Sequence, residues 1–185
     1  MRIIAGSARG RRLTAPRGAA TRPSAGRLRQ SLFDVLAPRL PGCRLLDAFA
    51  GSGAIGLEAL SRGAARVVFV ELRGPAVEAI RENLDRLRDA GRRARVVRSE
   101  VSAAIRALAR EREEFDLVFL DPPYQSPLLE PTLLALAPLL APHGLVIAEH
   151  FHKRELPETI GRLVKQRSLR VGDHRLSFYA CREDP

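Results

Sequence analysis

Residues 44–63 read RLLDAFAGSGAIGLEALSRG, and this stretch decides the expected fold. An apolar strand ends in Asp-Ala-Phe, a glycine-rich turn follows, and a short apolar helix then runs to a closing glycine. Gly51, Gly53 and Gly56 match the G-x-G-x-x-G pattern that joins a strand to a helix in nucleotide-binding βαβ units. Glu71 follows about 20 residues later, at the end of the next expected strand, where the same pattern places an acid on a ribose hydroxyl.

Strand-like and helix-like segments alternate on both sides of this turn. We expect strands at 44–49, 66–71, 94–98, 115–120 and 144–149, helices at 24–36, 55–61, 75–90, 102–112 and 128–140, a short helix at 158–160, and two antiparallel strands at 163–171 and 174–181. The alternation predicts an α/β fold with a doubly wound parallel sheet. Ligands of such sheets bind beyond the carboxyl ends of the strands, where Asp47, Glu71, Glu100 and Asp121 all fall.

The tetrapeptide Asp121-Pro122-Pro123-Tyr124 follows an expected buried strand. Two prolines lack an N–H and have a fixed φ, so the turn is stiff, and we expect their carbonyls to be free to accept hydrogen bonds. The Asp121 carboxylate adds an acceptor, and Tyr124 adds a flat face. Together these groups suit a planar ring with an exocyclic amine, such as a nucleobase. The alternative is a proline-rich turn with a helix-capping aspartate.

The glycine-rich turn leaves two cofactor classes open, and Asp47 bears on the choice. Taken alone, the turn predicts that the protein binds a nicotinamide dinucleotide and is an oxidoreductase. A carboxylate at the end of the first strand would repel a pyrophosphate, whereas it suits a cationic sulfonium and an ammonium. S-adenosylmethionine carries both cations. A capping role for Asp47 is the structural alternative.

Composition indicates a globular protein with a nucleic-acid partner. The chain has 185 residues, 45% of them hydrophobic, and a formal net charge of +10. No acid precedes Asp34, yet eight arginines do: Arg2, Arg9, Arg11, Arg12, Arg17, Arg22, Arg27 and Arg29. Arginine offers paired donors to phosphate and stacks on bases. We therefore expect residues 1–25 to form a basic nucleic-acid-binding extension with a small hairpin, and residues 26–185 to form the α/β domain. A soluble basic tail is the alternative for the extension.

Other features of the sequence bear on location and chemistry. It contains no apolar run of 18 residues and no signal-peptide pattern, so we expect a cytoplasmic protein without a membrane partner. The two cysteines, Cys43 and Cys181, lack metal or redox spacing, and the four histidines show no zinc pattern. The sequence therefore predicts no metal site and no cysteine nucleophile.

Residues 45–64 together with Asp121-Pro122-Pro123-Tyr124 resemble the small-subunit ribosomal RNA guanine-N2 methyltransferase D (RsmD) family. The N-terminal block resembles the family too, through RIIAG at 2–6, RGR at 9–11, RPS at 22–24 and RLR at 27–29. The resemblance extends from residue 2 to about residue 182. Gln30, Asp34 and Glu100 depart from the residues most common at these positions.

The resemblance implies a Rossmann-like class I methyltransferase with a mostly parallel seven-stranded sheet and a C-terminal antiparallel strand. It implies a monomer that uses S-adenosylmethionine to methylate one guanine of 16S ribosomal RNA within the small ribosomal subunit or a late assembly intermediate. The catalytic residues would be Asp121, Pro122, Pro123 and Tyr124. The cofactor would be bound by Asp47, Phe49, Gly51, Ser52, Gly53, Glu71, Leu72, Glu100 and Val101. The RNA would be bound by Arg2, Arg9, Arg11, Arg12, Arg22, Arg27 and Arg29.

Two rival functions stay open at this point. An adenine-N6 methyltransferase acting on DNA or RNA would share the Asp-Pro-Pro-Tyr motif but has no need of the N-terminal block. A nicotinamide oxidoreductase, or a non-catalytic nucleic-acid-binding domain, would share the glycine-rich turn. Cofactor binding separates the last group from the methyltransferases, and analysis of the modified nucleotide separates the two methyltransferases.

Overall fold

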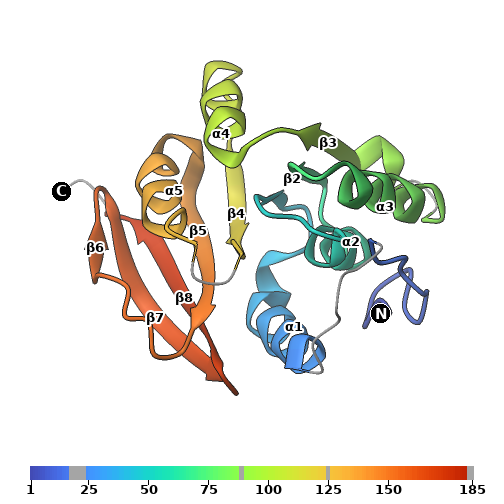
Figure 1. The fold of residues 1–185 in the computed structure, drawn as a ribbon, viewed down its shortest axis with the longest axis horizontal. Coiled ribbons are helices and arrows are strands. Elements are labelled where there is room, and N and C mark those ends of the chain that lie inside the picture. Colours follow the sequence, from blue (N-terminus) through green and yellow to red (C-terminus); the bar gives the residue numbers. More distant parts are fainter. Residues whose placement is uncertain (17–23, 88–89, 124–125, 183–185) are drawn as a thin grey trace.

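The computed structural model describes residues 1–16, 24–87, 90–123 and 126–182. One eight-stranded sheet runs through these residues in the order β3-β2-β1-β4-β5-β8-β7-β6 (Figure 1). The strands are β1 (Arg44–Asp47), β2 (Arg66–Glu71), β3 (Ala94–Arg98), β4 (Phe115–Leu120), β5 (Leu140–Phe151), β6 (Thr159–Ile160), β7 (Leu163–Val171) and β8 (His174–Cys181). Strands β1 to β5 are mutually parallel, and β8 is antiparallel to β5. The predicted α/β class and the mostly parallel sheet are confirmed.

Helices cover both faces of the sheet. They are α1 (Ser24–Leu36), α2 (Ala54–Ser61), α3 (Gly74–Asp85), α4 (Val101–Arg110) and α5 (Leu129–Ala135). Short 3₁₀ turns lie at Ala37–Arg39, Gly91–Arg93 and Ala137–Leu139. Side chains of α1, α2 and α3 share one buried cluster with one face of the sheet, and those of α4 and α5 share a second cluster with the other face. From β1 the chain proceeds outward to β2 and β3 on one side, and then to β4 and β5 on the other side. The strand order therefore reverses between β1 and β4, and ligands of such sheets bind at this point.

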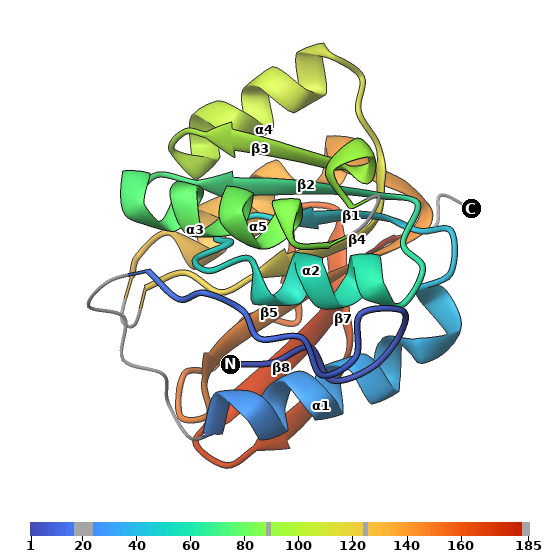
Figure 2. The same cartoon turned by 90° about the vertical axis from the view of Figure 1, so that its right-hand side faces the viewer.

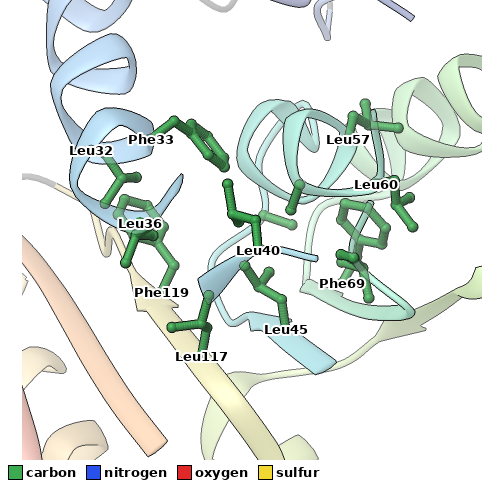
Figure 3. Packing of buried hydrophobic residues seen from close by; sticks show 14 of the residues in the cluster. Leu32, Phe33, Leu36, Leu40, Leu45, Leu57, Leu60, Phe69, Leu117 and Phe119 are labelled. Atoms are coloured by element: carbon green, nitrogen blue, oxygen red, sulfur yellow. The ribbon is translucent and has the colours of Figure 1, made fainter. Parts of the chain in front are cut away.

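The cluster beneath α1 and α2 is a close-packed aliphatic and aromatic core (Figure 3). Leu32 and Phe33 of α1 are fully buried, as are Leu57 of α2 and Leu117 of β4. Gly56 lets α2 approach β2, because a Cβ added there would lie 2.2 Å from Cε1 of Phe69. The third glycine of the motif therefore sets the contact between helix and sheet, as the pattern predicts.

Three expected helices differ from the structure. The helix predicted at 75–90 is shorter, because α3 ends at Asp85. The helix predicted at 128–140 is interrupted: α5 ends at Ala135, a 3₁₀ turn contains Pro138, and Leu140 already begins β5. Proline removes a backbone donor and clashes with the preceding turn, so an uninterrupted helix cannot pass this point. Residues 159–160 form the two-residue strand β6, not part of a helix, and β6 raises the expected seven strands to eight among the described residues.

The N-terminal segment is folded back on α2, beside α1 (Figure 2). The expected hairpin is reduced to one antiparallel bridge between Arg2 and Arg12, with flanking backbone hydrogen bonds. Ile3 and Leu13 are buried in the same cluster as α1 and α2. The segment therefore packs against the α/β core through apolar side chains while its arginines stay outside.

Candidate active site

A cavity of about 1400 Å³ lies at the carboxyl ends of the parallel strands. The four strand-end acids predicted from the sequence, Asp47, Glu71, Glu100 and Asp121, all line it. A further part of its wall comes from the N-terminal segment and from α1, through residues that include Ile3, Leu28 and Arg29. The sequence predicted the edge of the sheet that forms the site, and it did not predict the wall that closes it.

The glycine-rich turn forms one side of the cavity. Gly51 and Gly53 have φ angles of +55° and +77°, which favour glycine, and Gly53 precedes the first turn of α2. A Cβ at Gly51 would meet nothing within 4 Å, so the backbone faces open space there. Gly51 and Ser52 line the cavity, and so does half-buried Phe49. Gly53 lies behind them against Ile80 and supports the turn.

Asp47 is buried at the base of this turn and accepts a hydrogen bond from the Gly56 N–H at 3.1 Å. The capping role considered for this residue is therefore present. The pKa of Asp47 is raised to about 7, mainly by burial and in smaller part by the nearby charges of Asp121 and Glu71, whereas the Gly56 N–H opposes the shift. The site thus holds a carboxyl group that is poised to ionise near neutral pH.

Glu71 is held in place by backbone amides from both sides. Its Oε2 accepts from the Gly51 N–H at 2.8 Å, and its Oε1 accepts from the Arg73 N–H at 2.8 Å. A carboxylate offers about four lone-pair directions, so these bonds orient the group without using its full capacity. The end of β2 and the glycine turn are thereby tied to each other through one side chain.

The next part of the wall combines polar and apolar side chains. Leu72 lines the cavity and is 59% exposed, which is unusual for a leucine. Glu100 is exposed at the start of α4, and buried Val101 follows it. An exposed acid beside aliphatic side chains suits a flat heterocycle with an amine at its edge.

Asp121 and Pro122 line the cavity after β4, as predicted. Asp121 is exposed, Pro122 is buried and Pro123 is exposed. The Pro123 carbonyl accepts from the Ser126 N–H at 2.9 Å, so it closes the turn. Tyr124 lies outside the described residues, and its stacking role stays a prediction.

Glu149 is a cavity residue that the sequence reasoning did not single out. It is 9% exposed, and His174 Nδ1 lies 2.9 Å from its Oε1. The available signal was its place at the end of the strand expected at 144–149, which matches the places of the four predicted acids. His174 could not be found in this way, because it reaches the site through the antiparallel pairing of β8 with β5.

The predicted RNA-binding arginines fall into two groups. The exposed ones are Arg2, Arg9, Arg11, Arg12 and Arg27. Arg29 is only 6% exposed, and its Nη2 donates to the Arg2 carbonyl at 2.6 Å, so it holds the N-terminal segment. Arg22 lies outside the described residues. Contact of any of these residues with RNA stays a prediction.

The chain is similar to known proteins over almost its whole length. It is 39% identical to the putative rRNA methyltransferase YlbH of Bacillus subtilis over 98% of this chain and 100% of that protein. It is 41% identical to ribosomal RNA small subunit methyltransferase D of Escherichia coli over 85% of this chain and 78% of that protein. The solved structure of the putative methyltransferase yhhF from Escherichia coli superposes with a TM-score of 0.83 at 35% identity, over 100% of this chain and 99% of that one.

A model of a protein family also matches nearly the whole chain. The model described as "Conserved hypothetical protein 95" matches residues 1–180, which span the basic segment, the glycine turn and the Asp-Pro-Pro-Tyr motif. The resemblance seen in the sequence is confirmed. The chain therefore belongs to the Conserved hypothetical protein 95 family, that of the ribosomal RNA small subunit methyltransferase D proteins.

Proposed function

We propose that this protein methylates the exocyclic N2 of a guanine in 16S ribosomal RNA, with S-adenosylmethionine as the methyl donor. The observation that carries the proposal is one cavity shared by two sets of groups. The glycine turn with Asp47 and Glu71 lies on one side, and Asp121 with Pro122 lies on the other. A methyl donor and a planar amine would thus meet at the end of β4. Family membership and the relatives' names supply the RNA substrate class.

The chemistry of the first side fits S-adenosylmethionine. Its strand-end acids would repel a pyrophosphate and attract the sulfonium and ammonium groups. Glu71 would accept from the ribose hydroxyls, Glu100 from the adenine amine, and Leu72 would cover the adenine ring. The open space at Gly51 leaves room for the methionine part beside the backbone. S-adenosylmethionine, when bound, supplies an electrophilic methyl group on sulfur.

The second side would hold the target base outside its stack. Asp121 and the Pro122 carbonyl would accept hydrogen bonds from the N2 amine. This amine is a weak nucleophile because its lone pair is delocalised into the ring. Orientation by fixed acceptors therefore contributes through geometry and through stabilisation of the positive charge that develops on nitrogen.

The exposed arginines of the N-terminal segment would bind phosphates next to the base. The substrate would then be the small ribosomal subunit or a late assembly intermediate, and the enzyme would act in the cytoplasm as a monomer. Among the residues that the structure describes, no helix is long and apolar enough to cross a membrane.

The test is methyl transfer to small-subunit particles purified from a strain that lacks the enzyme, followed by mass analysis of the modified nucleoside. We expect N2-methylguanosine. N6-methyladenosine would instead support the rival adenine methyltransferase and contradict the proposal.

Single substitutions test the base side and the cofactor side of the cavity separately. Asp121→Ala should lower turnover on the order of 10²-fold, because one preorganised acceptor is lost, and should leave cofactor affinity nearly unchanged. Glu71→Ala should weaken cofactor binding by roughly 1–3 kcal/mol, the range for a lost charged hydrogen bond. Asp85→Ala, at an exposed position on α3, is the control for removal of an acid. Normal turnover of Asp121→Ala on the particle would refute the role given to this residue.

A further inference from the structure

Glu149 lies beside Asp121 because of the register between β4 and β5. Leu120 pairs with Ala148 in parallel register, so Asp121, the first residue after β4, lies beside Glu149, which is still within β5. Both line the same cavity. Side chains alternate along a strand, so Glu149 shares the face of Ile147, which packs in the cluster with α1. The Glu149 carboxylate therefore belongs to the part of the cavity assigned to the target base.

His174 fixes this carboxylate. It lies on β8, on the same face as Leu176, and its Nδ1 is 2.9 Å from Oε1 of Glu149. The side chains are 15% and 10% exposed, so the pair is largely shielded from water. A shielded acid close to Asp121 is unfavourable by charge repulsion. A carboxylate has about four acceptor directions, and because Glu149 lines the cavity, a ligand bound there can donate to it.

We propose that Glu149, oriented by His174, selects guanine by accepting a hydrogen bond from the ring N1–H next to the methylated amine. This inference rests on the proposed function and adds the residue that sets base specificity. Asp121 and Pro122 recognise only an amine, which adenine and cytosine also carry. The Glu149 carboxylate recognises the ring nitrogen next to that amine.

The chemistry of the bases makes this contact decisive. In guanine the ring nitrogen N1 next to the amine-bearing carbon carries a hydrogen. In adenine and cytosine the ring nitrogen next to the amine-bearing carbon is an unprotonated acceptor. A carboxylate accepts and cannot donate, so it attracts guanine N1–H and repels the other two bases. Sites built around a substrate N–H reject analogues without it by about 10⁴-fold.

The test uses 2-aminopurine, which keeps the 2-amine but has no hydrogen on N1. Once the target guanine is mapped, small-subunit particles are reconstituted with guanine or 2-aminopurine at that position. The measured quantity is the ratio of kcat/KM values for methyl transfer to the two particles. We expect the wild-type enzyme to prefer guanine by more than about 10²-fold, and Glu149→Gln to lower this ratio by at least about tenfold, because an amide can donate to N1.

Matched variants separate selectivity from folding. Glu155→Gln makes the same change at an exposed side chain of the same region and should leave the ratio unchanged. His174→Ala should lower the ratio, and His174→Gln, whose amide can still donate to Glu149, should restore it in part. Cofactor affinity, measured by calorimetry, reports whether each variant retains its fold.

The outcomes distinguish this inference from the proposed function. A wild-type enzyme that transfers methyl groups to guanine N2 but prefers guanine over 2-aminopurine by less than about tenfold overturns the role of Glu149, whatever the variants do. An unchanged ratio in a Glu149→Gln protein with normal cofactor affinity overturns it as well. A wild-type enzyme with no activity on guanine-containing particles refutes the proposed function itself.

Discussion

At the scale of single residues, Asp47 shows how the cavity alters the chemistry of a side chain. Burial is the main reason that its pKa rises from the usual 3.8 to about 7. Between roughly pH 4 and pH 7, the folded protein keeps a proton on Asp47 that the unfolded chain has released. A raised acid pKa therefore means that the free energy of unfolding falls as pH increases through this window.

Replacing Asp47 by asparagine should remove this dependence. The expected result is that the wild-type free energy of unfolding carries a downward contribution of up to roughly 1.4 kcal/mol per pH unit between pH 4.5 and 7, and that Asp47→Asn lacks it. Urea titrations across this range measure the difference. Asp85→Asn, at an exposed site, should keep the wild-type profile. Parallel curves for wild type and Asp47→Asn would show that the carboxyl group is ionised throughout.

At the scale of elements, the N-terminal segment is positioned by α2. Glu58 of α2 is fully buried, and its carboxylate accepts from the N–H groups of Ile4 at 2.7 Å and Ala5 at 2.9 Å. Ser61 donates to the Ala5 carbonyl at 2.6 Å and accepts from the Ala8 N–H at 3.0 Å. Because Ile3 and Ile4 also line the cavity, this docking makes the basic N-terminal segment part of the cavity wall.

Two glycines allow this docking to be tested with a matched pair. Gly6 and Gly10 have nearly equal φ angles, +83° and +81°. A Cβ at Gly6 would lie 2.0 Å from the Ser61 carbonyl oxygen, whereas a Cβ at Gly10 would meet nothing within 4 Å. We expect Gly6→Ala to displace the segment and Gly10→Ala to add only the backbone strain of about 1–2 kcal/mol. Hydrogen exchange at residues 3–13 measures the displacement, and similar exchange in both variants would contradict the docking.

Local sequence patterns predicted the elements well where the pattern fits only one type of element. The alternation of apolar runs and glycine turns predicted β1 to β4 and the helices between them, because buried parallel strands leave a continuous apolar signature. The same apolar signature misled at residues 128–140, where Leu and Ala continue through Pro138 into β5. Periodicity does not distinguish an apolar helix from an apolar strand, and only the proline indicated the change.

At the scale of the whole molecule, the candidate active site joins parts that are distant in sequence. Four of its acids were predictable, because the carboxyl ends of parallel strands meet at one edge. The wall made by residues 1–4 and α1 was not predictable, because it depends on how the N-terminal segment docks. The contact of Glu149 with His174 depends on antiparallel pairing across 25 residues of chain, which no local pattern encodes.

The position of the exposed arginines predicts a polarised molecule whose α1–α2 side binds RNA. Arg9 and Arg12 are exposed on the N-terminal segment, on the face of the sheet opposite α4. Arg106 and Arg110 are exposed on α4 itself and provide a control with the same loss of charge. If the N-terminal arginines bind phosphates, the variant with glutamine at 9 and 12 should bind small-subunit particles with a shallower dependence on salt, by about 0.7–0.9 units of slope per lost contact. The variant with glutamine at 106 and 110 should keep the wild-type slope. Binding measured across a salt series decides between them, since equal slopes in both variants would mean that the N-terminal charge acts only through the net charge of the protein.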